Sequence, residues 1–188
     1  METGCSMKRY GNIYEKICDM DNLREAHRNA RKDKLFYAEV VMVDSDPDKY
    51  LSEIREMLIN HTYSVNLDDY TISTINDKGK QRELWKLPYF PHRIIQWAIM
   101  LQIEPIFNKV FTGFTCASLP NRGIKKAQEL VNTYLKDEPG TQYCFKMDVH
   151  HFYPSINHRI LKRLLRKKFK DPELLALLDI IIDSHPPK

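Results

Sequence analysis

Residues 143–156 constrain this 188-residue chain more than any other segment, because they predict a strand that ends in a carboxylate. Tyr143, Phe145 and Met147 recur at every second position, which is the period of a β-strand with one apolar face. Asp148 follows on the opposite face, at the C-terminal edge of the predicted strand. A carboxylate there can hold a divalent cation against a phosphate, although a strand-end Asp alone is more typical of a helix cap or a salt bridge. The segment is therefore a candidate for half of a metal site.

Helical patterns dominate the remainder of the chain. Asn22 is expected to cap a helix within the first thirty-odd residues. Asp46 and Pro47 predict the N-cap and first residue of a second helix, and Asp171 and Pro172 predict the same for a helix near residue 188. Each of these helix starts is predicted from the capping residue and its immediate neighbours alone.

One region departs from the helical period. Between residues 63 and 87 apolar residues alternate, and the turn residues Asn76–Lys80 predict a β-hairpin with a basic tip. Helices mixed with a few strands predict an α+β fold rather than a doubly wound sheet.

Composition adds weaker constraints. The formal net charge of +4 favours a polyanionic partner without demanding one. No apolar run is long enough for a signal core or a membrane span, so we expect a cytoplasmic protein with no membrane partner. The cysteines have no zinc-finger spacing and are expected to be reduced; they are Cys5, Cys18, Cys116 and Cys144.

Three more segments carry basic residues in a fixed order. They read Lys78-Gly-Lys80-Gln-Arg82, Leu87-Pro-Tyr-Phe-Pro-His-Arg93 and Asn121-Arg122-Gly-Ile. In this order, and followed by Asp148-Val-His-His-Phe-Tyr-Pro-Ser-Ile, they resemble the motifs of bacterial retroelement reverse transcriptases, the branch of group II intron, retron and diversity-generating enzymes. The resemblance implies a right-hand polymerase fold, of which this chain would be the fingers and the proximal palm.

The resemblance also implies a metal site and a sugar gate. Asp148 would be the catalytic carboxylate and a ligand of Mg²⁺, and the carbonyl of Val149 would add a neutral ligand in a two-metal site. Tyr153 would place its ring against the sugar of the incoming nucleotide and exclude a ribose 2′-hydroxyl by volume. The alternative for Tyr153 is a core aromatic on a strand-to-helix turn.

A triphosphate site follows from the same resemblance. Arg82 and a nearby lysine, either Lys78 or Lys80, would grip the triphosphate, because a guanidinium meets phosphate oxygens bidentately. Consecutive backbone N–H groups after Asp148 would face it as an anion nest. These N–H groups belong to His150, His151 and Phe152. A basic hairpin by itself is more often a solvated turn.

The sequence does not decide whether two arginines and one basic helix stabilise the fold or contact nucleic acid. Arg93 and Arg122 are expected either to form scaffold ion pairs or to contact nucleic acid. The motif that this segment resembles has an Asp directly before its Arg. Here His92 occupies that position, which puts an ion pair between neighbouring Asp and Arg residues in doubt. The helix within Lys162–Lys170 could bind template phosphates or present a solvated amphipathic face.

The resemblance divides the chain into an N-terminal helical region at 1–62, fingers at 63–140 and the start of a palm at 141–188. The Tyr-x-Asp-Asp hairpin that supplies the other metal ligands does not occur in these residues, and Leu67–Tyr70 carries its letters in the wrong order. We therefore expect this chain not to polymerise DNA alone. The expected partners are an RNA template, a DNA primer, a deoxynucleoside triphosphate and an accessory protein.

Two other functions are compatible with the sequence. The chain could be a non-catalytic RNA-binding or partner-assembly module on the same scaffold. It could also belong to another palm-fold polymerase, such as a primase-like enzyme, which would accept ribonucleotides despite Tyr153.

Overall fold

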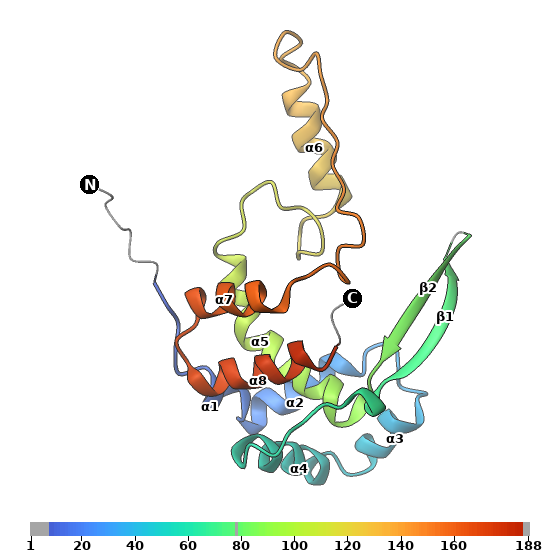
Figure 1. Cartoon of the computed structure of the whole chain (residues 1–188), viewed down its shortest axis with the longest axis vertical. Helices are drawn as coiled ribbons and strands as arrows, with labels where there is room; N and C mark the ends of the chain where they lie inside the picture. The colour runs from blue at the N-terminus through green and yellow to red at the C-terminus, as the bar shows by residue number, and fades with distance from the viewer. Residues whose placement is uncertain (1–7, 78, 186–188) are drawn as a thin grey trace. The chain divides into compact units, whose positions relative to one another are not determined.

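The structure, a computed structural model, describes residues 8–77 and 79–185 (Figure 1). The chain divides into two compact units, and each is described by itself. The first unit spans Met1–Ile103 and Tyr153–Lys188, and the second spans Glu104–Phe152.

The described residues form helices and one β-hairpin, which confirms the predicted α+β class. The helices that belong wholly to the first unit are α1 (Tyr14–Ile17), α2 (Met20–Ala30), α3 (Ala38–Ser45), α4 (Pro47–Ile59), α7 (His158–Lys168) and α8 (Pro172–Asp183). Helix α5 (Ile94–Asn108) begins in the first unit, and α6 (Ile124–Tyr134) lies in the second. The hairpin of the first unit comprises β1 (Thr71–Asp77) and β2 (Lys80–Lys86).

Local side-chain caps explain the starts of α2, α4, α7 and α8. The Asp46 side chain accepts from the Lys49 N–H at 3.2 Å, with Pro47 at the first helical position of α4, as predicted. The predicted cap at Asn22 is wrong, because Asp19 begins α2 and its carboxylate accepts from the N–H groups of the first turn. Asn22 lies within the first turn of α2, and the Asp19 carboxylate adds a negative charge at the positive end of the helix.

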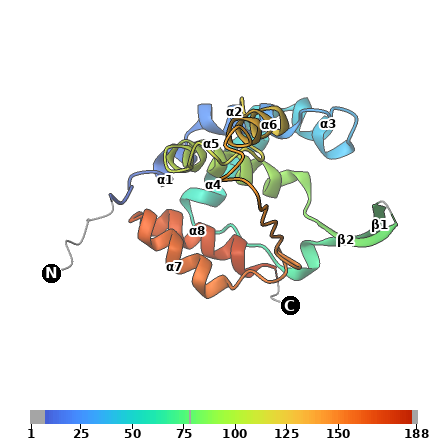
Figure 2. The same cartoon turned by 90° about the horizontal axis from the view of Figure 1, so that it is seen from above.

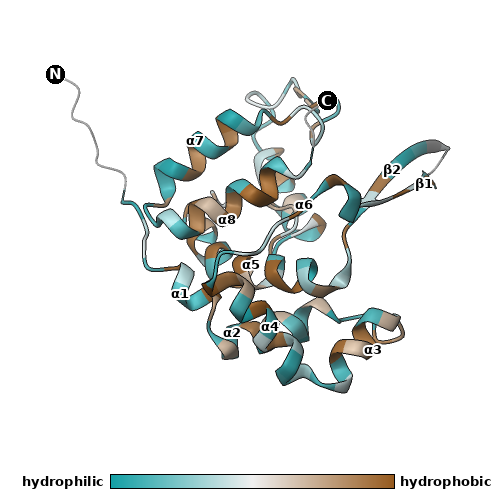
Figure 3. Ribbon diagram, turned by 60° about the horizontal axis from the view of Figure 1, so that its bottom comes forward, coloured by the Kyte–Doolittle hydropathy of each residue, from teal (hydrophilic) through white to brown (hydrophobic). Residues whose placement is uncertain are grey.

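The core of the first unit lies where the apolar faces of its helices meet (Figure 3). The fully buried side chains include Leu23, Leu51, Ile54, Leu58, Ile94, Ile95, Phe169 and Leu174. They come from α2, α4, α5 and the α7–α8 corner, so residues more than a hundred positions apart share one core. Burial of each such side chain stabilises the fold by about 1.5–3 kcal/mol.

A single carboxylate ties the chain's N-terminal segment to α8. Asp171 Oδ2 accepts from the N–H groups of Ile13 at 2.7 Å and Tyr14 at 3.0 Å, while Oδ1 caps α8 by accepting from Leu174 at 3.3 Å. Beside it, Tyr10 forms a parallel bridge to Phe169. One side chain thus caps two helices, α1 and α8, that are distant in sequence.

The surroundings of Asp171 fix its charge state. Burial would raise the pKa of Asp171, but hydrogen bonds from the N–H groups of Tyr14, Ile13, Leu174 and Glu173 outweigh burial and hold the pKa below its usual value of about 3.8. The carboxylate is therefore ionised wherever the protein is folded at neutral pH.

The hairpin is antiparallel, with Ile75 opposite Arg82, and it extends from the helices of the first unit (Figure 2). At its turn Asn76 accepts from the N–H of Gly79, whose φ of 83° lies in the region that favours glycine. At its base the Tyr70 hydroxyl lies 2.8 Å from Ser184 Oγ, just past α8. The hairpin base is thus attached to the C-terminal end of α8.

Replacing Asp171 tests the link between α1 and α8. Asp171→Ala is expected to lower the free energy of unfolding by about 2–4 kcal/mol, because it removes two charge-assisted hydrogen bonds and a helix cap. Urea unfolding followed by circular dichroism measures this loss.

The pH dependence of the same link follows from the lowered pKa. The contribution of ionised Asp171 is present above the usual Asp pKa and is lost as the pH falls through the lower folded value. The stability difference between the wild type and Asp171→Asn should therefore shrink in acid. An unchanged difference across that range would contradict the link.

Candidate functional site

The segment before Asp148 does not form the predicted strand. Residues 143–149 have no regular secondary structure, and the sheet seen in the described residues has two strands, β1 and β2. The side chains of Tyr143, Phe145 and Met147 are 93%, 85% and 78% exposed. A strand needs a neighbour for its hydrogen bonds and a surface for its apolar face. Neither is present for this segment in the described chain, so the alternation is left open to solvent.

Asp148 and the residues after it lie on the surface of the second unit. Asp148, Val149, His150 and His151 are all exposed, and the two histidine rings meet edge to face with centroids 3.9 Å apart. Within residues 8–77 and 79–185, no three His, Cys, Asp or Glu side chains are grouped so that they could hold a metal ion. Asp148 and the Val149 carbonyl are thus at most a partial ligand set.

The candidate gate residue begins the segment that leads into α7. Tyr153 is 82% exposed, and its carbonyl accepts from Ile156 at 3.3 Å in a turn. Asn157 then caps α7, because its side chain accepts from the Ile160 N–H at 3.0 Å. The ring of Tyr153 is therefore not buried as a core aromatic.

The candidate triphosphate residues lie on the hairpin. Lys78 lies outside the described residues, and Lys80 begins β2. Arg82 is exposed on β2 in the first unit, whereas Asp148 belongs to the second. Their joint grip on one nucleotide stays a prediction.

Arg93 takes a scaffold position. Its Nε donates to the Ala30 carbonyl at the end of α2, at 3.3 Å. His92 is buried, its Nδ1 lies 3.0 Å from the Tyr63 hydroxyl, and burial lowers the pKa of His92 despite Asp69 and Glu39 nearby. His92 is therefore neutral and hydrogen-bonds Tyr63 at the position before Arg93.

Sequence reading missed a polar network at the same place. His27 Nδ1 lies 2.7 Å from the Tyr89 hydroxyl, and His27 Nε2 lies 2.8 Å from Asp44 Oδ1. Arg31 pairs with the same Asp44 oxygen at 2.6 Å. Glu39 accepts from the backbone N–H of Tyr89. The one available signal was the spacing of His27 and Arg31, which places both on one face of α2.

Arg122 also contacts the scaffold. Its Nη1 donates to the carbonyls of Thr112 at 2.6 Å and Thr115 at 2.9 Å, and it thereby closes the loop between α5 and α6 in the second unit. A nucleic-acid contact by Arg93 or Arg122 stays a prediction, and either one would have to coexist with these bonds.

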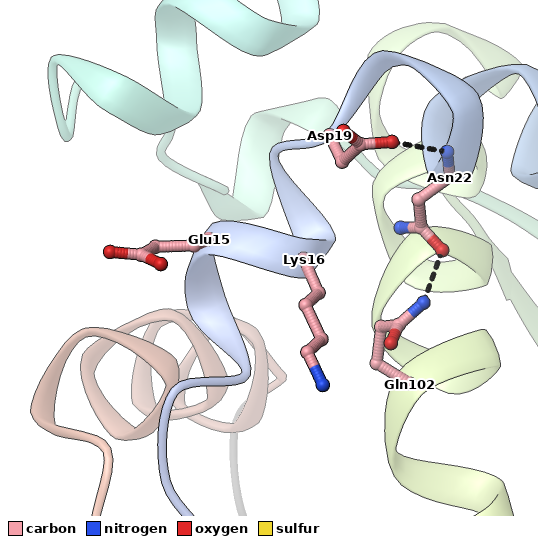
Figure 4. Close-up of a pocket in the computed structure, with 5 residues that line it drawn as sticks. All are labelled: Glu15, Lys16, Asp19, Asn22 and Gln102. Carbon is pink, nitrogen blue, oxygen red and sulfur yellow. Dashed lines mark hydrogen bonds between the residues drawn. The ribbon is translucent and has the colours of Figure 1, made fainter.

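A pocket of about 430 Å³ lies elsewhere in the first unit, at the junction of α1, α2 and α5 (Figure 4). Gln102 donates to Asn22 Oδ1 at 2.6 Å, and Asn22 Nδ2 donates to the Ala98 carbonyl at 3.2 Å. Asn22 thus joins α2 to α5 instead of capping a helix. The remaining lining residues are Glu15, Lys16 and Asp19. None of the candidate catalytic residues lines this pocket.

Comparison with known proteins gives one distant similarity and no family assignment. No protein-family model matches the chain. The chain is 28% identical over 102 residues to Protein YkfC of Escherichia coli (strain K12), a match that covers 53% of the chain and 26% of YkfC. The matched region thus spans about a quarter of that relative. None of the helices in the described ranges is long and apolar enough to cross a membrane.

The scaffold role of Arg93 is open to a direct test. Arg93→Ala is expected to lower the free energy of unfolding by about 1 kcal/mol, since it removes a partly buried hydrogen bond. Chemical denaturation of the variant measures the loss, with Arg55→Ala on the exposed face of α4 as the control. Unchanged stability together with weakened RNA binding would instead assign Arg93 to nucleic acid.

Proposed function

We propose that this chain is the fingers and proximal palm of an RNA-directed DNA polymerase from a bacterial or phage retroelement. The observation that carries the proposal is the exposed apolar alternation that ends at Asp148. A row of large apolar side chains at every second position is the pattern of a strand that pairs and packs elsewhere. The ordered motifs around Arg82, Arg93 and Arg122 support the same function.

The proposed chemistry is nucleotidyl transfer with two Mg²⁺ ions, which activate the primer hydroxyl and stabilise the leaving pyrophosphate. Asp148 and Val149 fit one edge of such a site, because a carboxylate and a carbonyl are oxygen ligands and both residues are exposed. They are too few for two cations, which repel each other unless several carboxylates compensate their charge. The remaining ligands must come from other parts of the polymerase.

The alternative function, a non-catalytic RNA-binding module, is supported by the charge of α7. Helix α7 carries six Arg or Lys residues and no Asp or Glu, as a non-catalytic RNA-binding module could. Reading the nucleotides after codon 188 separates the two functions. A continuing frame with a Tyr-x-Asp-Asp motif favours the polymerase, and a stop codon favours the module.

Loss of the Asp148 carboxylate should abolish polymerisation. In a polypeptide whose frame continues past codon 188, Asp148→Ala is expected to slow primer extension on RNA about a thousandfold or more, because metal-borne stabilisation is worth several kcal/mol. Primer extension with deoxynucleotides and Mg²⁺ measures this. Glu138→Ala, an exposed carboxylate of the same unit, should leave the rate unchanged. Retained activity in Asp148→Ala would remove the assignment.

The proposed role of Tyr153 in excluding ribonucleotides can be tested separately. Tyr153→Ala should raise ribonucleotide incorporation by about tenfold or more relative to deoxynucleotides, because the smaller side chain leaves room for a 2′-hydroxyl. Tyr153→Phe should keep the discrimination, since the ring remains. Competition between the two nucleotide types in primer extension measures the ratio. A wild-type polymerase that already accepts ribonucleotides would favour a primase-like enzyme.

A further inference from the structure

Helix α7 carries its positive charges in two neighbouring rows, of which only one contacts α8. The inner cations pair with α8: Lys162 contacts Asp183 and lies 3.9 Å from Asp179, and Arg166 Nη1 bonds Asp179 at 3.2 Å. The acids of α8 therefore neutralise the cations that face α8.

The outer cations have no such partners. Arg159, Arg163 and Lys167 are exposed, and none of them makes a hydrogen bond or an ion pair with any described residue. They recur at every fourth position, so they form a row in which each step advances about 6 Å along the helix. That step is close to the spacing of phosphates along a nucleic-acid strand.

The geometry points to a phosphate-binding track for single-stranded RNA along this row, defined by Arg159, Arg163 and Lys167. Sequence alone left the helix open between template binding and a solvated face. The pairing with α8 now distinguishes three unpaired cations from two neutralised ones, and three aligned positive charges complement a polyanionic strand. The track rests on the proposed function for the identity of the RNA as a template.

A membrane surface is the competing partner for a basic amphipathic helix. The apolar residues exposed beside the row are Ile160 and Leu164, at 43% and 52% exposure. A helix that lies on a membrane inserts a wide apolar face, whereas α7 packs against α8. Figure 3 shows hydrophilic stretches along α7 alternating with hydrophobic ones, and α8 runs beside it. The exposed surface of α7 thus offers a row of three cations beside only two apolar side chains, which favours nucleic acid.

The test measures RNA binding by the 188-residue chain, so it does not depend on polymerisation. A fluorescein-labelled oligouridine strand is titrated at several KCl concentrations, with anisotropy as the readout. The variant Arg159→Gln, Arg163→Gln, Lys167→Gln removes the row. A control that removes the same charge elsewhere in the first unit is Lys32→Gln, Lys49→Gln, Arg55→Gln. A variant with both arginines replaced by lysine keeps the charge.

The row variant should flatten the slope of log affinity against log salt by about 2, because each single-strand phosphate contact contributes about 0.7. Its affinity at low salt should fall about tenfold or more, while the control and the lysine variant stay near wild type. Circular dichroism should show all four proteins equally helical.

Three results would overturn the track. The wild type could fail to bind the strand at low salt, the row variant could bind as the wild type does, or the row and control variants could weaken equally, which would mean that binding follows net charge. Tighter binding to phosphatidylserine vesicles than to RNA, lost in the row variant, would assign the row to a membrane instead. A polymerase inactivated by Asp148→Ala with its salt slope intact would separate the two proposals.

Discussion

The carboxylate of Asp171 is the interaction on which the first unit depends. It accepts the N–H groups of Ile13 and Tyr14, and it also begins α8. Since Asp171 lies just after Phe169, a fully buried side chain, it fixes the corner between α7 and α8. That corner decides which cations of α7 meet the acids of α8 and which remain outside. The corner at Asp171 therefore determines which cations of α7 are exposed.

The elements that sequence predicted well are those decided by neighbouring residues. Asp46 with Pro47 and Asp171 with Pro172 start α4 and α8, because a cap acts on N–H groups two or three positions away. The hairpin followed from its turn residues. The second role of Asp171, as hydrogen-bond acceptor for the start of α1, could not be predicted. The sequence shows that a carboxylate can accept hydrogen bonds, but it does not show that the donor lies 158 positions away.

The candidate site shows the same division between local and distant partners. The alternation before Asp148 is present in the sequence, but a strand forms only beside another strand, and the described residues offer none to this segment. The sequence is compatible with a scaffold or a nucleic-acid role for Arg93, and its observed bond to Ala30 depends on a helix more than sixty residues earlier. The network of His27, Tyr89 and Asp44 likewise joins three distant segments. Motif spacing identifies chemistry, whereas partners come from the fold.

Hydrogen exchange of the backbone amides at residues 143–149 is the sharpest test of the proposal that this segment is a polymerase strand without its partner. In the 188-residue chain these amides should exchange as fast as those of an unfolded peptide, because no ladder protects them. In a polypeptide that continues past residue 188 with a Tyr-x-Asp-Asp motif, alternate amides should be protected by orders of magnitude. Equally fast exchange in both proteins would contradict the proposal, as would strong protection in the shorter one.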